Sequence, residues 1–477
     1  MLCSLSAPAL ASHSPAKPIP QSVFAVPGDA RHVAIATRFG GVYFTADGGV
    51  TFMNACHEAL GADDVEAYPG AFTATGTLAV STGFRGVSTT TEGCNWSQWA
   101  PDSFGLIKDV APLGPGGLLA LKTDSELPSL NEVWSSTDAG TTWTLAPAAL
   151  PSDVTATSVY ASPDGAQWFV GTRTSAGARL FRSDDSGQNW ASFDFAGGDA
   201  RSPRIVGMSP APLTRLVAIL SLDHADGVEP AAGDVVVLSE DAGATWVPLY
   251  QSAHAVLGAA LDEDANLYFG NPEEGLFRFA LADVGNPEPL HVSMTPTRGL
   301  AAAGGRIYSI GDETTDGYTV AVSSDAGTTF TPFFALCKNS ITEACTNDSS
   351  VGTSCSSYGI ETEPWQPLGP ACTQKSAPTS TPVGGTGGNA GTGTPPGSDP
   401  NAPPTTQPGA PSAPGSSAGG APTNAALPAP SSSGGNGHSL FKCSSGASAP
   451  AGSSTPLVAL ALSLIALRRR QGTEKGD

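Results

Sequence analysis

Residues 136–143 read Ser-Thr-Asp-Ala-Gly-Thr-Thr-Trp, and this stretch decides the fold of the chain. Its composition is typical of a tight turn between two antiparallel strands. The carboxylate of Asp138 can accept backbone N–H groups inside the turn, and Gly140 supplies a positive φ. Trp143 opens the next strand and packs between neighbouring sheets. The stretch therefore predicts a hairpin turn whose aspartate is structural rather than catalytic.

The pattern recurs along the chain with a regular period. Five copies are well kept, and their aspartates are separated by 91, 47, 56 and 84 residues. Halving the two long gaps finds two worn copies, one with a threonine in place of the aspartate and one without the aromatic residue. The seven positions are Asp47, Thr91, Asp138, Asp185, Asp241, Asp283 and Asp325. Their spacings of 44, 47, 47, 56, 42 and 42 residues match the ~40–50-residue period of propeller blades.

The segments around each copy predict a meander of four strands with apolar residues at alternate positions. Blade one shows this in Val23–Val26, His32–Thr37, Gly41–Thr45 and Thr51–Asn54. Such a sheet cannot bury both faces alone, and radial stacking covers them while leaving few exposed edges. We therefore expect an all-β fold, a seven-bladed β-propeller of four-stranded antiparallel blades over residues 22–336. A six-bladed ring would turn one worn copy into a loop, although both worn copies keep their flanking strands.

The copies resemble Asp-box (BNR-like) repeats, which read Ser/Thr-x-Asp-x-Gly-x-Thr-Trp/Phe. The resemblance implies a propeller and leaves the function open. Asp-box repeats occur in sialidases, in xyloglucan-degrading glycosidases, in the luminal domain of sortilin and in a propeller that assists photosystem II assembly. Sialidases have six blades and an early Phe/Tyr-Arg-Ile-Pro segment, and this sequence has no such segment.

Both ends of the chain indicate export. Residues 1–11 end in Ala9-Leu10-Ala11, which is typical of a signal-peptidase site, and we interpret them as the remnant of a signal peptide. A merely apolar, disordered N-terminus is the alternative. Residues 376–438 are rich in Gly, Pro, Ser, Thr and Ala and predict a disordered linker.

The last part, residues 439–477, combines Cys443, a short apolar helix over Pro456–Leu467, and three arginines. This order resembles the MYXO-CTERM sorting tails of myxobacterial surface proteins. The resemblance implies anchoring at the cell surface or outer membrane, with Cys443 processed and Arg468, Arg469 and Arg470 retained on the cytoplasmic side.

Six cysteines lie between the two ends, and their even number favours disulfides in an oxidising compartment over free thiols. They are Cys56, Cys94, Cys337, Cys345, Cys355 and Cys372. Of the fifteen possible pairings, we expect Cys56 to pair with Cys94 and the last four to pair among themselves. The chain opens with an inner strand and ends with an outer one, so no strand exchange closes the ring. We expect the Cys-rich segment 337–375 to close it, over the joint between blades one and seven.

Charge and composition exclude several functions. The chain has a formal charge of −21, and 40 of its 43 acidic residues lie between residues 21 and 376, so the folded part would repel nucleic acid and anionic lipid. No zinc spacing, nucleotide-binding loop or nucleophile motif is found in the sequence. We expect no cofactor and no metal. Residues 262–266 faintly resemble a calcium loop, but turn chemistry explains them better.

The candidate functional residues lie in loops on the face opposite the Asp-box turns. Arg38, Arg85 and Arg173 follow the second strand of blades one, two and four, and they form either an anion-binding patch or ordinary solvated arginines. Many loop carboxylates share this face, and none can be singled out as a pair of glycosidase catalysts. They are Asp124, Glu126, Asp223, Asp226, Glu229, Glu273, Glu274, Asp312, Glu313 and Asp316.

These observations favour a monomeric binding or scaffold module for envelope proteins or glycans, attached to the membrane only through its tail. A glycoside hydrolase acting on extracellular polysaccharide is the alternative. A purely structural surface protein without a specific ligand is a third possibility.

Overall fold

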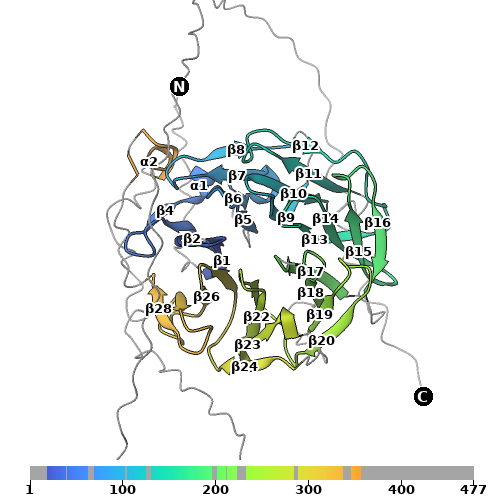
Figure 1. The fold of residues 1–477 in the computed structure, drawn as a ribbon. Helices are drawn as coiled ribbons and strands as arrows, with labels where there is room; N and C mark the ends of the chain where they lie inside the picture. The colour runs from blue at the N-terminus through green and yellow to red at the C-terminus, as the bar shows by residue number, and fades with distance from the viewer. Residues whose placement is uncertain are drawn as a thin grey trace, which may run out of the picture. The chain divides into compact units, whose positions relative to one another are not determined.

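The computed structural model describes residues 19–38, 40–62, 69–101, 105–124, 130–195, 201–210, 212–222, 233–283, 288–336, 345–346 and 348–355. The chain divides into two compact units, residues 1–389 and 390–477, and every described residue belongs to the first. The described strands form seven antiparallel sheets of four consecutive strands each. Figure 1 shows the sheets as the blades of a ring, with the first strand of each blade nearest the centre. The predicted seven-bladed propeller is confirmed.

The strands of each blade follow one another along the chain, from the innermost to the outermost. The blades and their strands are: one, β1 (Ile19–Val26), β2 (Asp29–Arg38), β3 (Gly41–Thr45) and β4 (Met53–Ala55); two, β5 (Gly70–Phe72), β6 (Leu78–Ser81), β7 (Val87–Thr90) and β8 (Ser97–Trp99); three, β9 (Leu106–Leu113), β10 (Gly117–Thr123), β11 (Asn131–Ser136) and β12 (Thr144–Leu145); four, β13 (Thr155–Ala161), β14 (Trp168–Thr174), β15 (Gly177–Ser183) and β16 (Ala191–Asp194); five, β17 (Arg201–Met208), β18 (Leu216–Leu222), β19 (Val235–Ser239) and β20 (Val247–Gln251); six, β21 (Gly258–Leu261), β22 (Asn266–Asn271), β23 (Gly275–Ala280) and β24 (Leu290–Ser293); seven, β25 (Leu300–Ala303), β26 (Arg306–Ile310), β27 (Val320–Ser323) and β28 (Thr331–Phe334). Four short helices complete the described elements: α1 (His57–Leu60), η1 (Gly83–Arg85), η2 (Leu281–Asp283) and α2 (Ser350–Cys355).

The second strand of each blade is the most apolar because neighbouring blades cover both of its faces. All seven residues of β10, Gly-Leu-Leu-Ala-Leu-Lys-Thr, are buried, as are the first five of β18. Outer strands such as β12 are exposed instead. The core consists accordingly of seven separate hydrophobic clusters, one at each joint between adjacent blades. This arrangement is what radial stacking of amphipathic sheets predicts.

The joint between blades seven and one, called the seam below, closes without strand exchange, as predicted. β28 stays in the sheet of blade seven and β1 in that of blade one. The rings of Phe333 and Phe334 pack against Phe52, with centroids 5.7 and 4.6 Å apart. The hydroxyl of Tyr308 donates a hydrogen bond to the backbone oxygen of Ala30 at 2.9 Å. Side-chain packing therefore provides the main contact across the seam.

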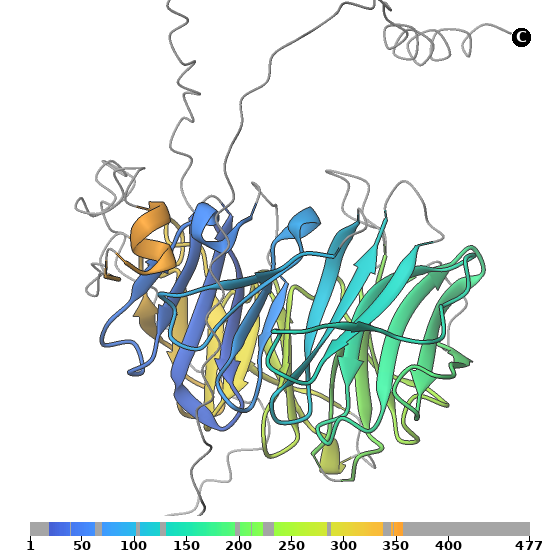
Figure 2. The ribbon, with the colours of Figure 1, turned by 90° about the horizontal axis from the view of Figure 1, so that it is seen from above.

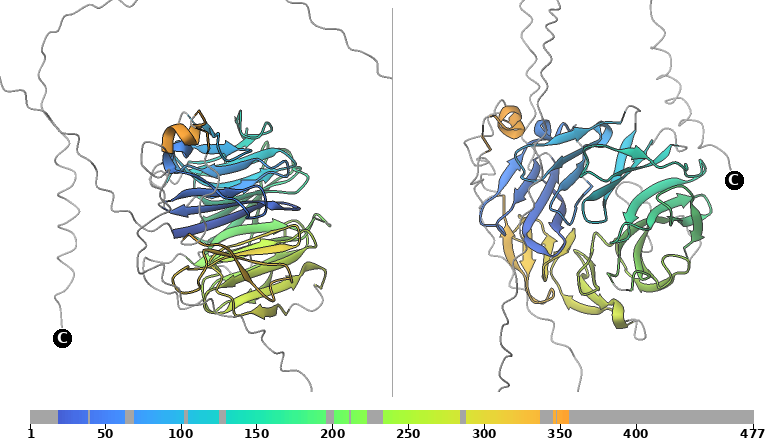
Figure 3. Two further views of the ribbon diagram at one scale, coloured as in Figure 1. Left: turned by 90° about the vertical axis from the view of Figure 1, so that its left-hand side faces the viewer. Right: turned by 45° about the horizontal axis from the view of Figure 1, so that its top comes forward.

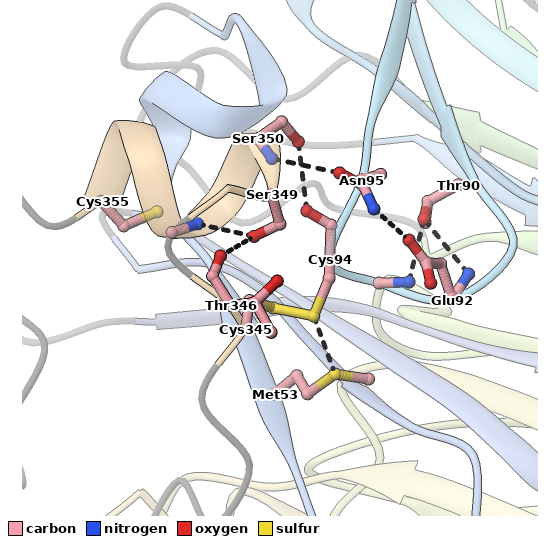
Figure 4. The surroundings of a disulfide bond; sticks show 12 residues. Met53, Thr90, Glu92, Cys94, Asn95, Cys345, Thr346, Ser349, Ser350 and Cys355 are labelled. Atoms are coloured by element: carbon pink, nitrogen blue, oxygen red, sulfur yellow. Dashed lines mark hydrogen bonds between the residues drawn. A yellow bond between two sulfur atoms is a disulfide. The ribbon is translucent and has the colours of Figure 1, made fainter.

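Residues 345–346 and 348–355, called the clasp below, lie against the outer ends of blades one and two. Disulfides join Cys355 to Cys56 after β4, and Cys345 to Cys94 in the turn after β7. Figure 4 shows the second disulfide and its surroundings. α2 lies beside α1 in Figures 2 and 3. Its Val351 is 5% exposed and belongs to the hydrophobic cluster between blades one and two.

These contacts correct the predicted disulfide pairing. The expected Cys56–Cys94 bond is wrong, and so is the expected pairing of Cys345 and Cys355 within the last four cysteines, because the clasp packs where blades one and two meet and offers Cys56 and Cys94 a partner each. The closing role of segment 337–375 stays a prediction, since much of the segment lies outside the described residues. Its described part lies on blades one and two. The reason is the turn of blade two, where Ser350 donates to the carbonyl oxygen of Cys94 at 3.1 Å and accepts the N–H of Trp96 at 2.9 Å.

Several predicted features lie outside the described residues. They are the signal-peptide remnant over residues 1–11, Cys337 and Cys372, the linker over residues 376–438, and the tail with Cys443, Arg468, Arg469 and Arg470. No helix in the described ranges has the length and apolarity needed to cross a membrane.

Candidate functional site

The turn between β11 and β12 shows how a box residue is used. The carboxylate of Asp138 accepts the backbone N–H of Thr142 at 2.8 Å, the Thr142 hydroxyl at 2.7 Å and the Ser136 hydroxyl at 2.8 Å. These bonds, led by the Thr142 N–H, lower the pKa of Asp138 from 3.8 to about 2. Trp143 closes the turn by donating its indole N–H to the carbonyl oxygen of Gly140 at 3.0 Å. Each of these hydrogen bonds joins the Asp138 carboxylate to another residue of the same turn.

Four other aspartates sit in the same bond pattern, each accepting a backbone N–H four residues on: Asp47, Asp185, Asp241 and Asp325. In blade two the turn bonds come from Thr90 and Glu92. The Thr90 hydroxyl accepts the N–H of Gly93 at 2.9 Å, and the Glu92 carboxylate accepts the side-chain amide of Asn95 at 2.5 Å. The repeat pattern in the sequence predicted Thr91 at this place, which lies between Thr90 and Glu92. Asp283 ends η2, and its side chain lies outside the described part.

The three predicted arginines lie at the expected end of their blades. Arg38 is the last residue of β2, Arg85 ends η1 after β6, and Arg173 lies in β14. All three are therefore near hairpins between second and third strands, at the end of the blade opposite the Asp-box turns. Each of them makes interactions with other groups. Blades one and two are adjacent in the ring, whereas Arg173 lies two blades further on.

Large apolar side chains are exposed on the same face, called the loop face below. Phe84 in η1 is 44% exposed, Leu257 before β21 is 46% exposed, and Met294 before β25 is 54% exposed. They lie in connections that share this face because strands alternate in direction within each blade. Figure 2 shows the short helices α1 and η1 at this end of the blades. These three side chains lie at different blades, and single exposed apolar side chains are ordinary on protein surfaces.

Several described carboxylates of the loop face already accept hydrogen bonds or form ion pairs. Glu274 binds the hydroxyl of Ser252, and it accepts the Asn271 side-chain amide at 2.6 Å. Burial alone would raise the pKa of Glu274, but these bonds hold it below its ordinary value. Asp316 forms an ion pair with Arg298 at 2.7 Å. Glu126, Asp223, Asp226 and Glu229 lie outside the described residues.

A carboxyl group that sequence reasoning missed lies on an innermost strand. Burial raises the pKa of Asp109, in β9, to about 6. Its two oxygens accept the N–H groups of Val110 and of Val159 in the next blade, both at 2.9 Å. Arg204 of blade five lowers that pKa in part, and its guanidinium donates a hydrogen bond to the carbonyl oxygen of Val256 at 2.9 Å. The adjacent charges Lys108-Asp109 inside an otherwise apolar strand were the available signal.

The loop that resembles a calcium site is a hydrogen-bonded turn. The Asp262 carboxylate accepts the backbone N–H groups of Asp264 and Asn266 at 3.0 and 2.7 Å. The turn places one oxygen of Glu263 where it accepts the N–H of Gly304 in blade seven at 2.9 Å and that of Gly28 in blade one at 2.7 Å. Glu263 of blade six thus bridges the seam. Within the described part of the chain, no three His, Cys, Asp or Glu side chains are placed to share a metal ion.

Comparisons with known proteins agree with the propeller fold. The family model of the DUF6242 β-propeller domain matches residues 65–256. No curated protein sequence matches the chain.

Among solved structures, the chain is similar to a GH74 xyloglucanase from Xanthomonas campestris, with 14% identity, coverage of 69% of this chain and 62% of the enzyme, and a TM-score of 0.42. It is also similar to the hydrazine synthase of Kuenenia stuttgartiensis, with 14% identity, coverage of 67% and 99%, and a TM-score of 0.47. A chain of a nidogen–laminin complex is similar at 12% identity, with coverage of 55% and 94% and a TM-score of 0.38. A propeller fold does not by itself decide between catalysis and binding.

Proposed function

We propose that this protein is exported and acts at the cell surface as a non-enzymatic binding or scaffold module for envelope proteins or glycans. The two disulfides support export, because such bonds persist in oxidising compartments outside the cytosol. The C-terminal tail supplies the attachment, with Cys443 as the processed residue. Its linker of residues 376–438 gives the propeller freedom to meet partners at some distance.

The loop face is the proposed working surface, and the exposed Phe84 beside Arg85 carries the proposal. Phe84, Leu257 and Met294 present apolar area to solvent at the ends of three different blades. Arg85 follows Phe84 directly, so that apolar and cationic chemistry lie side by side in η1. Aromatic and arginine side chains are the residue types that dominate binding energy at protein interfaces. Aromatic rings are also suitable platforms for sugar rings.

The carboxylates favour this proposal over glycoside hydrolysis. A glycosidase needs an acid with a raised pKa, facing a second carboxylate across a cleft. Glu274 has a lowered pKa and Asp316 is paired with arginine. Asp109 has a raised pKa, but both of its oxygens are bound to backbone N–H groups.

A binding screen tests the proposal. The oxidised full chain is applied to a glycan array and to separated envelope proteins, while released sugar is measured in parallel. We expect selective retention without sugar release, and a loss of at least tenfold in affinity for the double variant Phe84→Ala, Arg85→Ala. Val50→Ala on the opposite face is the matched control, because Val50 is 78% exposed. Sugar release would overturn the proposal in favour of the hydrolase.

Fractionation of cells tests the attachment separately. The full chain should be recovered with the outer membrane or cell surface, and Cys443→Ala should release it into the medium or retain it unprocessed. Recovery of the unaltered chain from the cytosol would contradict both export and attachment.

A further inference from the structure

We infer that Lys108 and Arg204 form a binding site for a small oxyanion at the centre of the ring. Lys108 lies in β9, the innermost strand of blade three, and Arg204 lies in β17, the innermost strand of blade five. Figure 1 shows both strands near the centre of the ring. The site is separate from the proposed working surface, because both residues lie within strands and not in connections of the loop face.

The charges of the innermost strands are the reverse of those of the whole chain. Residues 21–376 contain 40 acidic and 16 basic side chains. The seven innermost strands contain one acidic side chain, Asp109, and three basic ones, Lys108, Arg201 and Arg204. Arg201 is 7% exposed and donates to a backbone carbonyl oxygen of blade five at 3.0 Å. Lys108 and Arg204 are therefore the cations that can meet a ligand.

Both cations are exposed, although they lie inside their strands and not at the strand ends. At Lys108 the register between β9 and β10 shifts and leaves that residue unpaired, a distortion that changes the direction of a side chain. Across the ring, the innermost strands β21 and β25 read Gly-Ala-Ala-Leu and Leu-Ala-Ala-Ala. Their side chains are mostly small, and solvent reaches both cations.

Hydrogen bonds through blade four place the two cations at the same level of the ring. Asp109, next to Lys108, accepts a backbone N–H of β13 at 2.9 Å. The adjacent residue of β13, Ser158, donates to the carbonyl oxygen before Arg204 at 2.9 Å and accepts the N–H after it at 3.2 Å. Burial raises the pKa of Asp109 to about 6, and Arg204 and Lys108 both lower it in part. Both cations therefore lie near one carboxylate.

The two carboxylates near the cations are used by the backbone. Both oxygens of Asp109 accept backbone N–H groups at 2.9 Å. Asp234, which lies close enough to Arg204 to stabilise its charge, is 1% exposed and accepts the N–H of Val256 at 2.8 Å. Within the described part of the chain, neither Lys108 nor Arg204 is hydrogen-bonded or ion-paired to a carboxylate. Their positive charges are therefore available to a ligand.

The remaining donors are of the kind that binds an oxyanion. Arg204 donates from Nη2 to the carbonyl oxygen of Val256 at 2.9 Å, and a guanidinium has five N–H donors in all. Its planar fork binds a carboxylate or a phosphate through two parallel hydrogen bonds, and the Lys108 ammonium adds a point charge. A uronic acid of an acidic polysaccharide and a free inorganic oxyanion share this chemistry.

Isothermal titration calorimetry tests the inference on the oxidised full chain at constant ionic strength, with sodium sulfate and sodium glucuronate as probes. We expect saturable binding of at least one probe. Lys108→Gln should weaken it by about fivefold or more, and Arg204→Gln by about tenfold or more. Arg31→Gln is the matched control, because it also removes one positive charge, from a side chain that is 71% exposed at the other end of blade one. Its affinity should equal that of the unaltered protein.

Two further variants make the result decisive. Arg204→Lys keeps the charge without the fork and should retain part of the affinity, and it serves where Arg204→Gln does not fold. Phe84→Ala with Arg85→Ala should leave the binding unchanged, so that failure of the loop-face proposal and failure of this inference are distinguishable.

The order of affinities identifies the source of the oxyanion. Tighter binding of glucuronate than of sulfate and of uncharged glucose would indicate an acidic sugar, and tighter binding of sulfate would indicate an inorganic oxyanion. The inference would be overturned if neither probe bound saturably, or if neither Lys108→Gln nor Arg204→Lys changed the affinity. Equal weakening by Lys108→Gln and Arg31→Gln would also overturn it, because the binding would then follow net charge alone.

Discussion

Gly48 and Gly49 share a positive φ, of 78° and 94°, but differ in what surrounds them. A Cβ at Gly48 meets nothing within 4 Å, whereas a Cβ at Gly49 would lie 2.4 Å from Cε2 of Phe333. Alanine at the first position also matches the other turns, where Ala139, Ala242 and Ala326 adopt a positive φ. We therefore predict that Gly48→Ala lowers the free energy of unfolding by only about 1 kcal/mol, the cost of a left-handed alanine. Gly49→Ala should lower it by about 2 kcal/mol or more.

Urea denaturation followed by tryptophan fluorescence measures both variants. Equal midpoints for the two alanine variants would contradict the close contact of the blade-one turn with Phe333 across the seam.

Asp138 makes stability depend on pH in a defined direction. Its folded-state pKa is about 2 and its ordinary value is 3.8, mainly because of the Thr142 N–H. Its stabilising contribution is therefore fully present above the ordinary value and is lost as the pH falls through the folded value. We predict that Asp138→Asn lowers Tm most above pH ~5 and that the difference from the unaltered protein vanishes toward pH ~2. Asp153→Asn, at an exposed position, is the control and should leave Tm unchanged across this range. A Tm difference for Asp138→Asn that stayed constant with pH would show that the charge of Asp138 does not stabilise the turn.

At the scale of elements, the turn between β21 and β22 bridges three blades through Glu263. The charged carboxylate accepts N–H groups from both blades of the seam, so its removal leaves two turns without a shared acceptor. We predict that Glu263→Ala lowers the free energy of unfolding by about 1 kcal/mol, because the group is exposed and its bonds are weakened by solvent. The free energy of unfolding of Glu263→Gln should lie between those of Glu263→Ala and the unaltered protein. Hydrogen exchange at Gly28 and Gly304 should quicken in Glu263→Ala and stay unchanged in Asp264→Ala; equal exchange in both variants would show that Glu263 does not bridge the seam.

The elements that could be predicted from the sequence are those determined by residues close together in the chain. The turn around Asp138 is specified by eight consecutive residues, so both the turn and the blade period could be predicted from them. The worn turn of blade two was misaligned by one residue because Glu92 replaces the missing aspartate from a different position. The disulfide pairing depends on where residues 299 positions apart meet, which no local pattern contains. Glu263 was missed for the same reason, since its partners belong to blades one and seven.

For the candidate site on the loop face, too, the sequence predicted positions along the chain but not the contacts between blades. Strand alternation predicted that Arg38, Arg85 and Arg173 lie at one end of the blades, and the structure places them there. Whether such side chains act together depends on the packing of whole blades. The exposure of Phe84 likewise follows from its place in η1 and not from its sequence neighbours.

At the scale of the whole molecule, the two disulfides make the ring covalently continuous. Six joints between blades are spanned by the chain itself, and the clasp adds a covalent link from blade seven to blades one and two. A loop of 299 residues restricts the unfolded chain, and the loop-entropy relation gives a stabilisation of about 6 kcal/mol. Because this effect lies in the unfolded state, reduction should leave the folded ring intact.

We therefore predict that the variant with Ser at positions 56, 94, 345 and 355 keeps the circular dichroism spectrum of the oxidised protein but unfolds at a markedly lower denaturant concentration. Cys94→Ser with Cys345→Ser, which retains the larger loop, should lose less than half of this stabilisation. The packing across the seam explains why the ring persists without its covalent link: Phe52, Phe333 and Phe334 still exclude water from the joint between blades seven and one. A reduced protein with a changed spectrum, or with rapid hydrogen exchange confined to blades seven and one, would show instead that the disulfides hold the seam closed in the folded state.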